Sequence, residues 1–157
     1  MKILNSFYIL VLLLFTSCAT LQGRLKDEIS LNKKMDEWHA AASIGNTDGY
    51  FDLMDTTFVY LGTDISERWD KRTFLSFCKP YFDKGTGWDF KATSRTWYFN
   101  RKTAWFEEKL STWMGPIRAS GVFVKRNNSW KIAHYNLTLT VDNDNIISYL
   151  KLNPQKD

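Results

Sequence analysis

The sequence predicts an α+β fold in which helices come first and a run of long antiparallel strands follows. Apolar residues recur at steps of four, three and four from Leu31 to Ala42, which is the period of one helix face. After residues 84–87 the chain instead alternates apolar and polar residues over long segments, as half-buried strands do. The 157 residues are enough for one domain with a single hydrophobic core.

The first residues have the pattern of an export signal. Residues 1–17 hold one lysine and an apolar block from Phe7 to Phe15, which is too short to span a bilayer but suits a signal peptide. Small residues before Cys18 resemble a bacterial lipobox, although Phe15 stands where leucine is typical. This pattern predicts cleavage before Cys18, lipidation of Cys18, and a protein anchored to a membrane of the bacterial cell envelope. A cleaved signal without a lipid is the alternative.

The mature chain is expected to have three parts. Residues 18–27 are short and polar and should form a tether, residues 28–145 the folded domain, and residues 146–157 a C-terminal tail. Gly45 is expected to end the first helix and Asn46 to cap a short second one, because these residue types favour those positions.

One strand and a third helix are predicted next. Residues 56–62 are β-branched and aromatic, which indicates a strand, and residues 63–68 should form a loop. Asp70 is a natural N-cap for the third helix, and Pro80 should end or kink that helix. The predicted strands that complete the domain are residues 88–99, 103–113, 117–126 and 129–141.

The turns between the last strands predict which side chains share a face. Asn127 and Asn128 form a two-residue hairpin signal, and we centre the preceding turn between Thr112 and Trp113. The predicted pairs are Ser120 with Tyr135, Glu107 with Arg118, and Trp105 with Ser120. Side chains alternate between the faces of a sheet, so one face should carry Trp105, Glu107, Arg118, Ser120 and Tyr135. The other face should carry Phe123, Ile132, His134 and Asn136.

Five segments of the chain, taken in order, carry a resemblance to a known family: WHAAASIGNTDGYFDLM, VYLGTDISERW, FCKPYFDKG, AWFEEKLSTWMG and WKIAHYNLT. Together they resemble the SnoaL-like branch of the nuclear transport factor 2-like (NTF2-like) superfamily over about residues 28–143. The resemblance implies a cone, in which a curved antiparallel or mixed sheet wraps around about three N-terminal helices and encloses a pocket. It implies less about function, because the superfamily holds isomerases, cyclases, dehydratases and assembly modules.

The expected site is a pocket for a small, partly apolar ligand inside the cone. Its predicted lining is Trp105, Glu107, Arg118, Ser120, Tyr135, Tyr60 and His39. Glu107 would be the general base if the protein is a cofactor-free acid–base enzyme, as carboxylates are in enzymes of the superfamily. A structural ion pair between Glu107 and Arg118 is the alternative. The resemblance also implies a homodimer, with Trp130, His134 and Asn136 as its predicted face, and a pure assembly module is a third reading.

Composition argues against several other classes. The net charge of +4 is spread among acids without a basic stripe, so no nucleic-acid partner is expected. Asp64 and Glu67 would bind a metal only with further ligands, and with two histidines in the chain no metal site is expected. The sequence has no phosphate loop or dinucleotide turn, so no cofactor is expected either.

Overall fold

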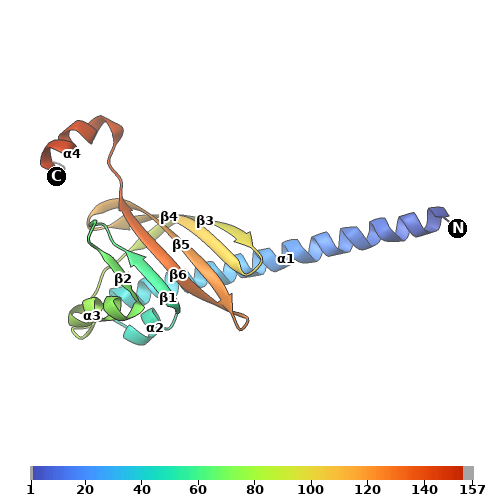
Figure 1. Ribbon diagram of the computed structural model, residues 1–157, viewed down its shortest axis with the longest axis horizontal. Coiled ribbons are helices and arrows are strands. Elements are labelled where there is room, and N and C mark those ends of the chain that lie inside the picture. The colour runs from blue at the N-terminus through green and yellow to red at the C-terminus, as the bar shows by residue number, and fades with distance from the viewer. Residues whose placement is uncertain (1, 154–157) are drawn as a thin grey trace.

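A long N-terminal helix supports one side of the molecule. The computed structural model describes the backbone of residues 2–153 and the side chains of residues 22–153. Helix α1 (Lys2–Ser43) runs unbroken, its second half along the sheet and its first half out beyond the domain (Figure 1). Residues 18–27, where a tether was expected, are therefore helical. No helix among the residues with described side chains is long and apolar enough to cross a membrane.

Two short helices follow where their caps predict them. The side chain of Asn46 accepts a hydrogen bond from the backbone N–H of Gly49 at the start of α2 (Thr47–Phe51). Asp70 does the same for the N–H of Thr73 in α3 (Lys71–Phe82), at 2.7 Å. Pro80 lies inside α3, so the prediction that this proline ends the helix is wrong. A 3₁₀ turn (Asn143–Asn145) and α4 (Ile146–Leu152) form the C-terminal end.

The sheet has six strands and is mixed. Its strands are β1 (Met54–Leu61), β2 (Arg68–Asp70), β3 (Lys91–Asn100), β4 (Thr103–Thr112), β5 (Gly115–Arg126) and β6 (Ser129–Leu139). They lie in the order β2-β1-β6-β5-β4-β3, with β1 parallel to β6 and the other neighbours antiparallel. The sheet curves over α1, α2 and α3 (Figure 1), which is the predicted α+β cone.

The register confirms one predicted turn and corrects the other. Asn127 and Asn128 both have positive φ, 47° and 65°, as a two-residue hairpin turn requires. The turn between β4 and β5 is centred between Trp113 and Met114 and not between Thr112 and Trp113, so Glu107 pairs with Ser120 and not with Arg118. The partner of Glu107 thus moves by two residues along β5. Because the shift is even, Glu107, Arg118 and Ser120 still share one face of the sheet, as predicted.

A bulge on β6 causes the larger error. Val122 pairs with His134 but Phe123 pairs with Ile132, so Ala133 is the extra residue on its strand. The shift pairs Tyr135 with Gly121 and not with Ser120. Tyr135 faces the interior, as predicted, but it lies there with Phe123 and Ile132. The predicted grouping of Tyr135 with Glu107, Arg118 and their neighbours is therefore wrong.

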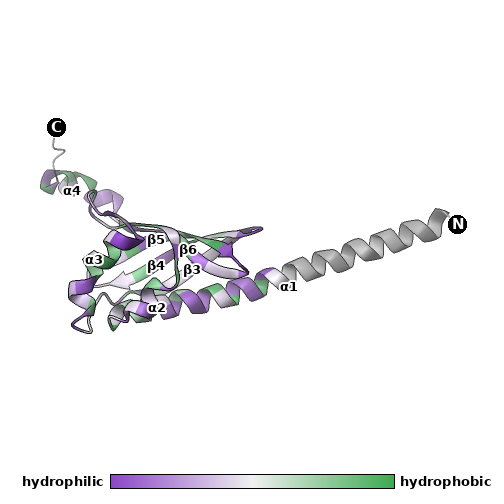
Figure 2. Ribbon diagram, turned by 60° about the horizontal axis from the view of Figure 1, so that its bottom comes forward, coloured by the Kyte–Doolittle hydropathy of each residue, from purple (hydrophilic) through white to green (hydrophobic). Residues whose placement is uncertain are grey.

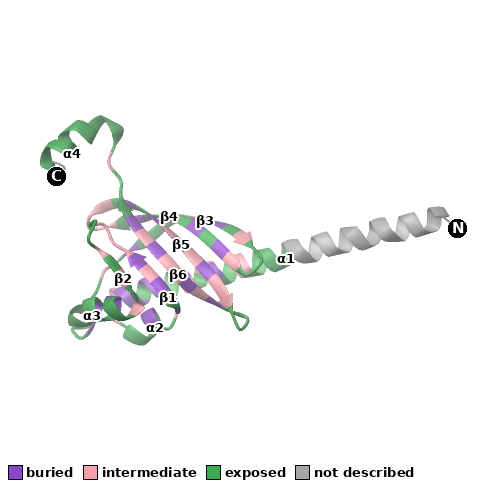
Figure 3. Cartoon of the chain, viewed as in Figure 1, coloured by how far each residue is buried: buried purple, intermediate pink, exposed green. Residues whose placement is uncertain are grey.

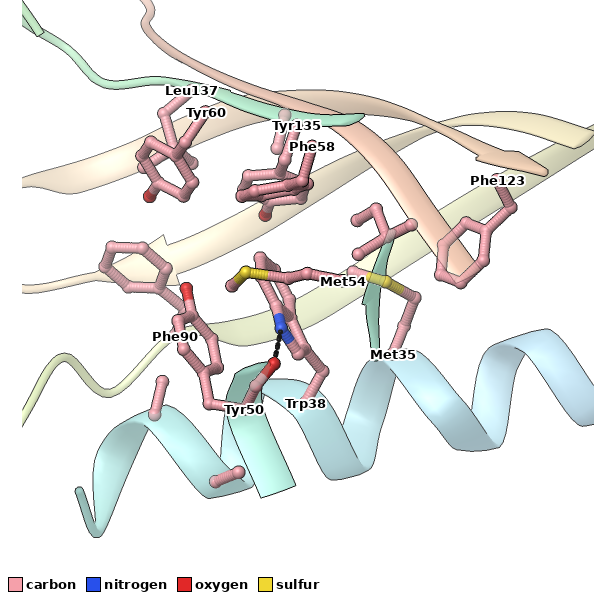
Figure 4. Close-up of a cluster of buried hydrophobic side chains, with 14 of the residues drawn as sticks. Met35, Trp38, Tyr50, Met54, Phe58, Tyr60, Phe90, Phe123, Tyr135 and Leu137 are labelled. Carbon is pink, nitrogen blue, oxygen red and sulfur yellow. Dashed lines mark hydrogen bonds between the residues drawn. The ribbon is translucent and has the colours of Figure 1, made fainter. Parts of the chain in front are cut away.

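Rings and aliphatic side chains fill the space between α1 and the sheet. Figure 3 shows buried residues alternating along the central strands, and Figure 2 shows the polar outer side of α1. In Figure 4, Trp38 points from α1 towards the sheet and its indole N–H donates to the backbone carbonyl of Tyr50 at 2.9 Å. Met35, Met54 and Phe123 fill the end of this core that lies away from Phe90.

Candidate functional site

A buried carboxylate stands at the centre of the fold, and it is Glu108, the neighbour of the predicted Glu107. Strand β4 turns Ala104, Phe106, Glu108 and Leu110 inward. The Glu108 side chain has no exposed surface. One of its oxygens, Oε1, accepts a hydrogen bond from the Tyr135 hydroxyl at 2.8 Å and lies 3.0 Å from Nε2 of His39. The other accepts from Nε of Arg95 at 2.8 Å.

These partners keep Glu108 ionised. Burial by itself would raise the pKa of Glu108, but the hydrogen bond and charge of His39 and the charge of Arg95 outweigh burial and lower this pKa below its ordinary value. Burial and the nearby carboxylate raise the pKa of Tyr135 well above its ordinary value. Arg95 continues to α1, where it binds Asp36 at 3.1 Å. The cluster therefore ties α1 to β3, β4 and β6, and both oxygens of Glu108 are already occupied.

Four of the predicted ligand residues lie on the outer, convex face of the sheet. Trp105 and Glu107 are exposed on β4, and Arg118 is exposed on β5 beside the half-buried Ser120. Trp105 stacks there on Tyr98, with ring centroids 5.7 Å apart. The expectation that these side chains face the interior of the cone is wrong, because β4 and β5 use the alternate residues for the core. The ion pair expected between Glu107 and Arg118 is absent among the described side chains.

The predicted dimer residues divide between the two faces. Trp130 is 4% exposed and its indole N–H donates to Asp27 of α1 at 2.9 Å, so its placement on an open face is wrong. The bulge on β6 is the cause, since it changes the alternation between Trp130 and the residues after it. His134 and Asn136 are half-buried on the outer face, where they were expected.

A groove of about 430 Å³ opens at the α3 end of the cone. It lies between α3, the loop after β1, the segment before β3 and the turn between β4 and β5. Its lining residues are Tyr60, Gly62, Thr63, Glu67, Trp69, Phe74, Phe77, Tyr81, Gly87, Trp88, Phe90, Trp113, Met114 and Leu137. Eight of these fourteen are aromatic. Among the predicted ligand residues, Tyr60 is the one that lines this groove.

His39 and Tyr135 lie one layer behind the groove. The Tyr135 ring is 5.6 Å from that of Tyr60, and the His39 ring is 6.4 Å from that of Phe90. Figure 4 shows Tyr60 and Phe90 on the groove side of the core, with Tyr135 deeper. The Glu108 cluster thus supports the groove wall without lining it.

Tyr50 leaves an unusual polar atom in this wall. Its side chain is fully buried, and its hydroxyl has no hydrogen-bond partner among the described residues. Burial raises the pKa of Tyr50 well above its ordinary value. The ring lies 6.0 Å from Phe74 and 5.8 Å from Trp88, which both line the groove. Buried hydroxyls are normally paired, so this one marks a place where the packing is not optimised for stability.

Sequence reasoning missed most of the groove. The aromatic residues of α3 recur at the spacing of a core-facing helix stripe, but Phe77 and Tyr81 are 37% and 49% exposed and line the groove. A second hollow of about 380 Å³, near Pro116 and Thr140, has no aromatic lining and is the poorer candidate. No group of His, Cys, Asp and Glu within the described part of the chain is arranged to hold a metal ion.

Known proteins match the chain in family and fold. The model of a SnoaL-like domain matches residues 31–142. No curated protein matches the sequence. An NTF2-like protein of unknown function from Pseudomonas putida has 12% identity and a TM-score of 0.64, covering 76% of this chain and 91% of its own.

Two further structures agree. An NTF2-like protein from Cytophaga hutchinsonii has 10% identity and a TM-score of 0.62, covering 72% of this chain and 98% of its own. A candidate dehydratase of the NTF2-like family from Streptomyces avermitilis has 12% identity and a TM-score of 0.64, covering 74% and 97%. At these identities the structures show that the fold is shared, and they carry no information about activity. The family match shows that the chain belongs to the SnoaL-like domain family, and the solved structures show that it has the fold of NTF2-like proteins.

Proposed function

We propose that the domain binds a small, largely apolar molecule in the aromatic groove beside α3. The observation that carries the proposal is the groove itself, since about 430 Å³ lined mostly by rings lies within the range of ordinary small-molecule sites. Folding alone favours burying such rings, and a bound apolar molecule would cover them. The unpaired hydroxyl of Tyr50 behind the wall fits a surface kept for a ligand at some cost in stability.

The positions of the two glutamates, Glu107 and Glu108, favour ligand binding over acid–base catalysis. Glu107 is on the outer face and cannot reach a molecule in the groove. Glu108 is buried, has both oxygens occupied and has a lowered pKa, which is the opposite of what a general base in a dry pocket needs. We therefore assign the His39–Glu108–Arg95 cluster a structural role.

Titration with the neutral apolar dye Nile red tests the proposal. We expect saturable fluorescence enhancement with the full chain, and a loss of affinity of about fivefold or more in Phe77→Ala, because one wall of the groove is removed. Trp105→Ala is the matched control, since Trp105 is a similarly exposed ring on the outer face. Failure to saturate, or a larger loss in Trp105→Ala than in Phe77→Ala, would refute the groove as the binding site.

We also propose that the protein is exported and held at a membrane by a lipid on Cys18. Support comes from the apolar block and the small residues before Cys18. Growth with an alkyne-bearing fatty acid should label the wild-type chain, and Cys18→Ala should abolish the label. Equal labelling of both chains would contradict the assignment.

A further inference from the structure

The charged groups that line the aromatic groove are negative only. Glu67 is the single ionised side chain among its fourteen lining residues, and no lysine, arginine or histidine is among them. A carboxylate ligand would therefore meet a like charge and no counter-charge. The chemistry of the lining allows a neutral or a positively charged guest.

Glu67 is held at the groove by its own loop. Its Oε2 accepts a hydrogen bond from the backbone N–H of Asp64 at 3.2 Å, and its backbone carbonyl accepts from the N–H of Gly62 at 2.9 Å. The carboxylate lies over Gly62, where a Cβ atom would collide with it. Within the described part of the chain, Glu67 is in no ion pair. Its negative charge is thus fixed in position and not neutralised.

The rings next to Glu67 add to this preference. Trp69 stacks on Phe77 with centroids 4.6 Å apart, and Tyr60 lies 5.9 Å from Trp69. Tyr60 and Glu67 both line the groove. Faces of aromatic rings carry negative potential and attract cations, tryptophan most strongly. Rings and carboxylate therefore favour the same kind of guest.

We infer that the natural ligand is an amine with an apolar body, whose ammonium group binds at Glu67 while the body lies against Trp69, Phe77 and Trp88. This inference depends on the proposed function, because it names the class of molecule that the groove takes. It adds a charge requirement that an apolar groove alone does not impose.

Three compounds on one skeleton test the charge requirement: 2-naphthylmethylamine, 2-naphthalenemethanol and 2-naphthoic acid. They are titrated at pH 7 into the full chain in detergent, with a detergent blank. We expect the amine to bind about five- to tenfold more tightly than the alcohol, and the acid to bind most weakly. Glu67→Gln keeps the acceptor for Asp64 and should lower the affinity for the amine to that for the alcohol, leaving the alcohol unchanged.

Two further variants make the result specific. Glu107→Gln makes the same change of charge on the outer face and should leave all three affinities unchanged. Gly62→Ala keeps the charge but displaces the carboxylate, so it should remove the preference for the amine. Equal affinity for amine and alcohol in the wild type, or an equal loss for all three compounds in Glu67→Gln, overturns the inference. If none of the three binds, the groove is not a ligand site and the proposed function falls with it.

Discussion

At the scale of single residues, Glu107 and Glu108 are adjacent in the chain and have opposite surroundings. Glu107 is in water on the convex face, whereas Glu108 is 2% exposed and paired with His39, Arg95 and Tyr135. A charge that has left water needs such partners, and each partner in turn depends on the charge. This mutual dependence makes the cluster a stabilising contact between α1 and the sheet.

Removal of the buried carboxylate should be costly. Glu108→Ala leaves the buried Arg95 without its counter-charge and His39 without its hydrogen-bond partner, and we expect the free energy of unfolding to fall by about 3–5 kcal/mol. Glu107→Ala removes the same side chain one residue earlier and should change this free energy by less than about 0.5 kcal/mol. Urea denaturation of the two variants measures the difference. Similar midpoints for both would show that the cluster does not hold the fold together.

Two buried tyrosine hydroxyls should respond in opposite ways. Tyr50→Phe removes a hydroxyl that has no described partner, so the free energy of unfolding should rise by up to about 1 kcal/mol. Tyr135→Phe removes a donor to the ionised Glu108 and should lower it by about 2 kcal/mol. Thermal melts of both variants beside the wild type decide the signs. A destabilised Tyr50→Phe would reveal a hydrogen bond to water at this hydroxyl.

At the scale of elements, Gly121 sits where β5 passes over the core. A Cβ atom there would lie 2.6 Å from a ring carbon of Phe106 and 2.8 Å from the carbonyl oxygen of His134. Gly121→Ala should therefore cost about 1–3 kcal/mol of stability, because the ring or the strand must move. Gly23→Ala, on α1 with nothing within 4 Å, is the control and should not destabilise the chain. Chemical denaturation compares the two variants, and a neutral Gly121→Ala would contradict close packing at this strand.

Elements with a local chemical signal could be predicted from the sequence. The caps at Asn46 and Asp70 and the turn at Asn127 and Asn128 each depend on a few neighbouring residues, and all three are present. The register between strands depends on contacts across the sheet, and the extra residue Ala133 leaves no comparable local signal. One bulge was enough to group Tyr135 with the wrong side chains of β4 and β5, because side chains alternate with a period of two.

The site was harder to predict for the same reason. Its aromatic residues come from α3, β1, β2, the segment before β3 and the turn between β4 and β5, and no one of these segments by itself indicates a groove. Only the arrangement of these rings in the folded protein distinguishes rings that line an open groove from rings that are buried in the core. Glu67 lies in a segment that was expected to form a loop without a metal site, and its position over Gly62 requires the folded loop.

At the scale of the whole molecule, the convex face of the sheet remains open. It carries the stacked pair Tyr98 and Trp105, each 43% exposed, and the half-buried His134 and Asn136. Large rings exposed side by side are typical of surfaces that bind a partner. We propose that two copies of the chain associate through this face.

Light scattering in mild detergent tests this association. The full chain should have the mass of two copies, and His134→Glu should shift it towards one copy, because a charge would be buried at the interface. Ser76→Glu adds the same charge on the exposed side of α3 and should leave the mass unchanged. A single-copy mass for the wild type would exclude the dimer under these conditions.

The unbroken course of α1 has a consequence for where a guest molecule would come from. With Cys18 in a bilayer, the thirteen residues from Cys18 to Leu31 would hold the core about 20 Å from the lipid headgroups, at 1.5 Å per residue. The groove beside α3 lies at the other end of the cone from the emerging helix (Figure 1). On the proposed lipid anchor, the groove would be on the side of the domain away from the bilayer, so a guest would reach it from solution and not from the lipid.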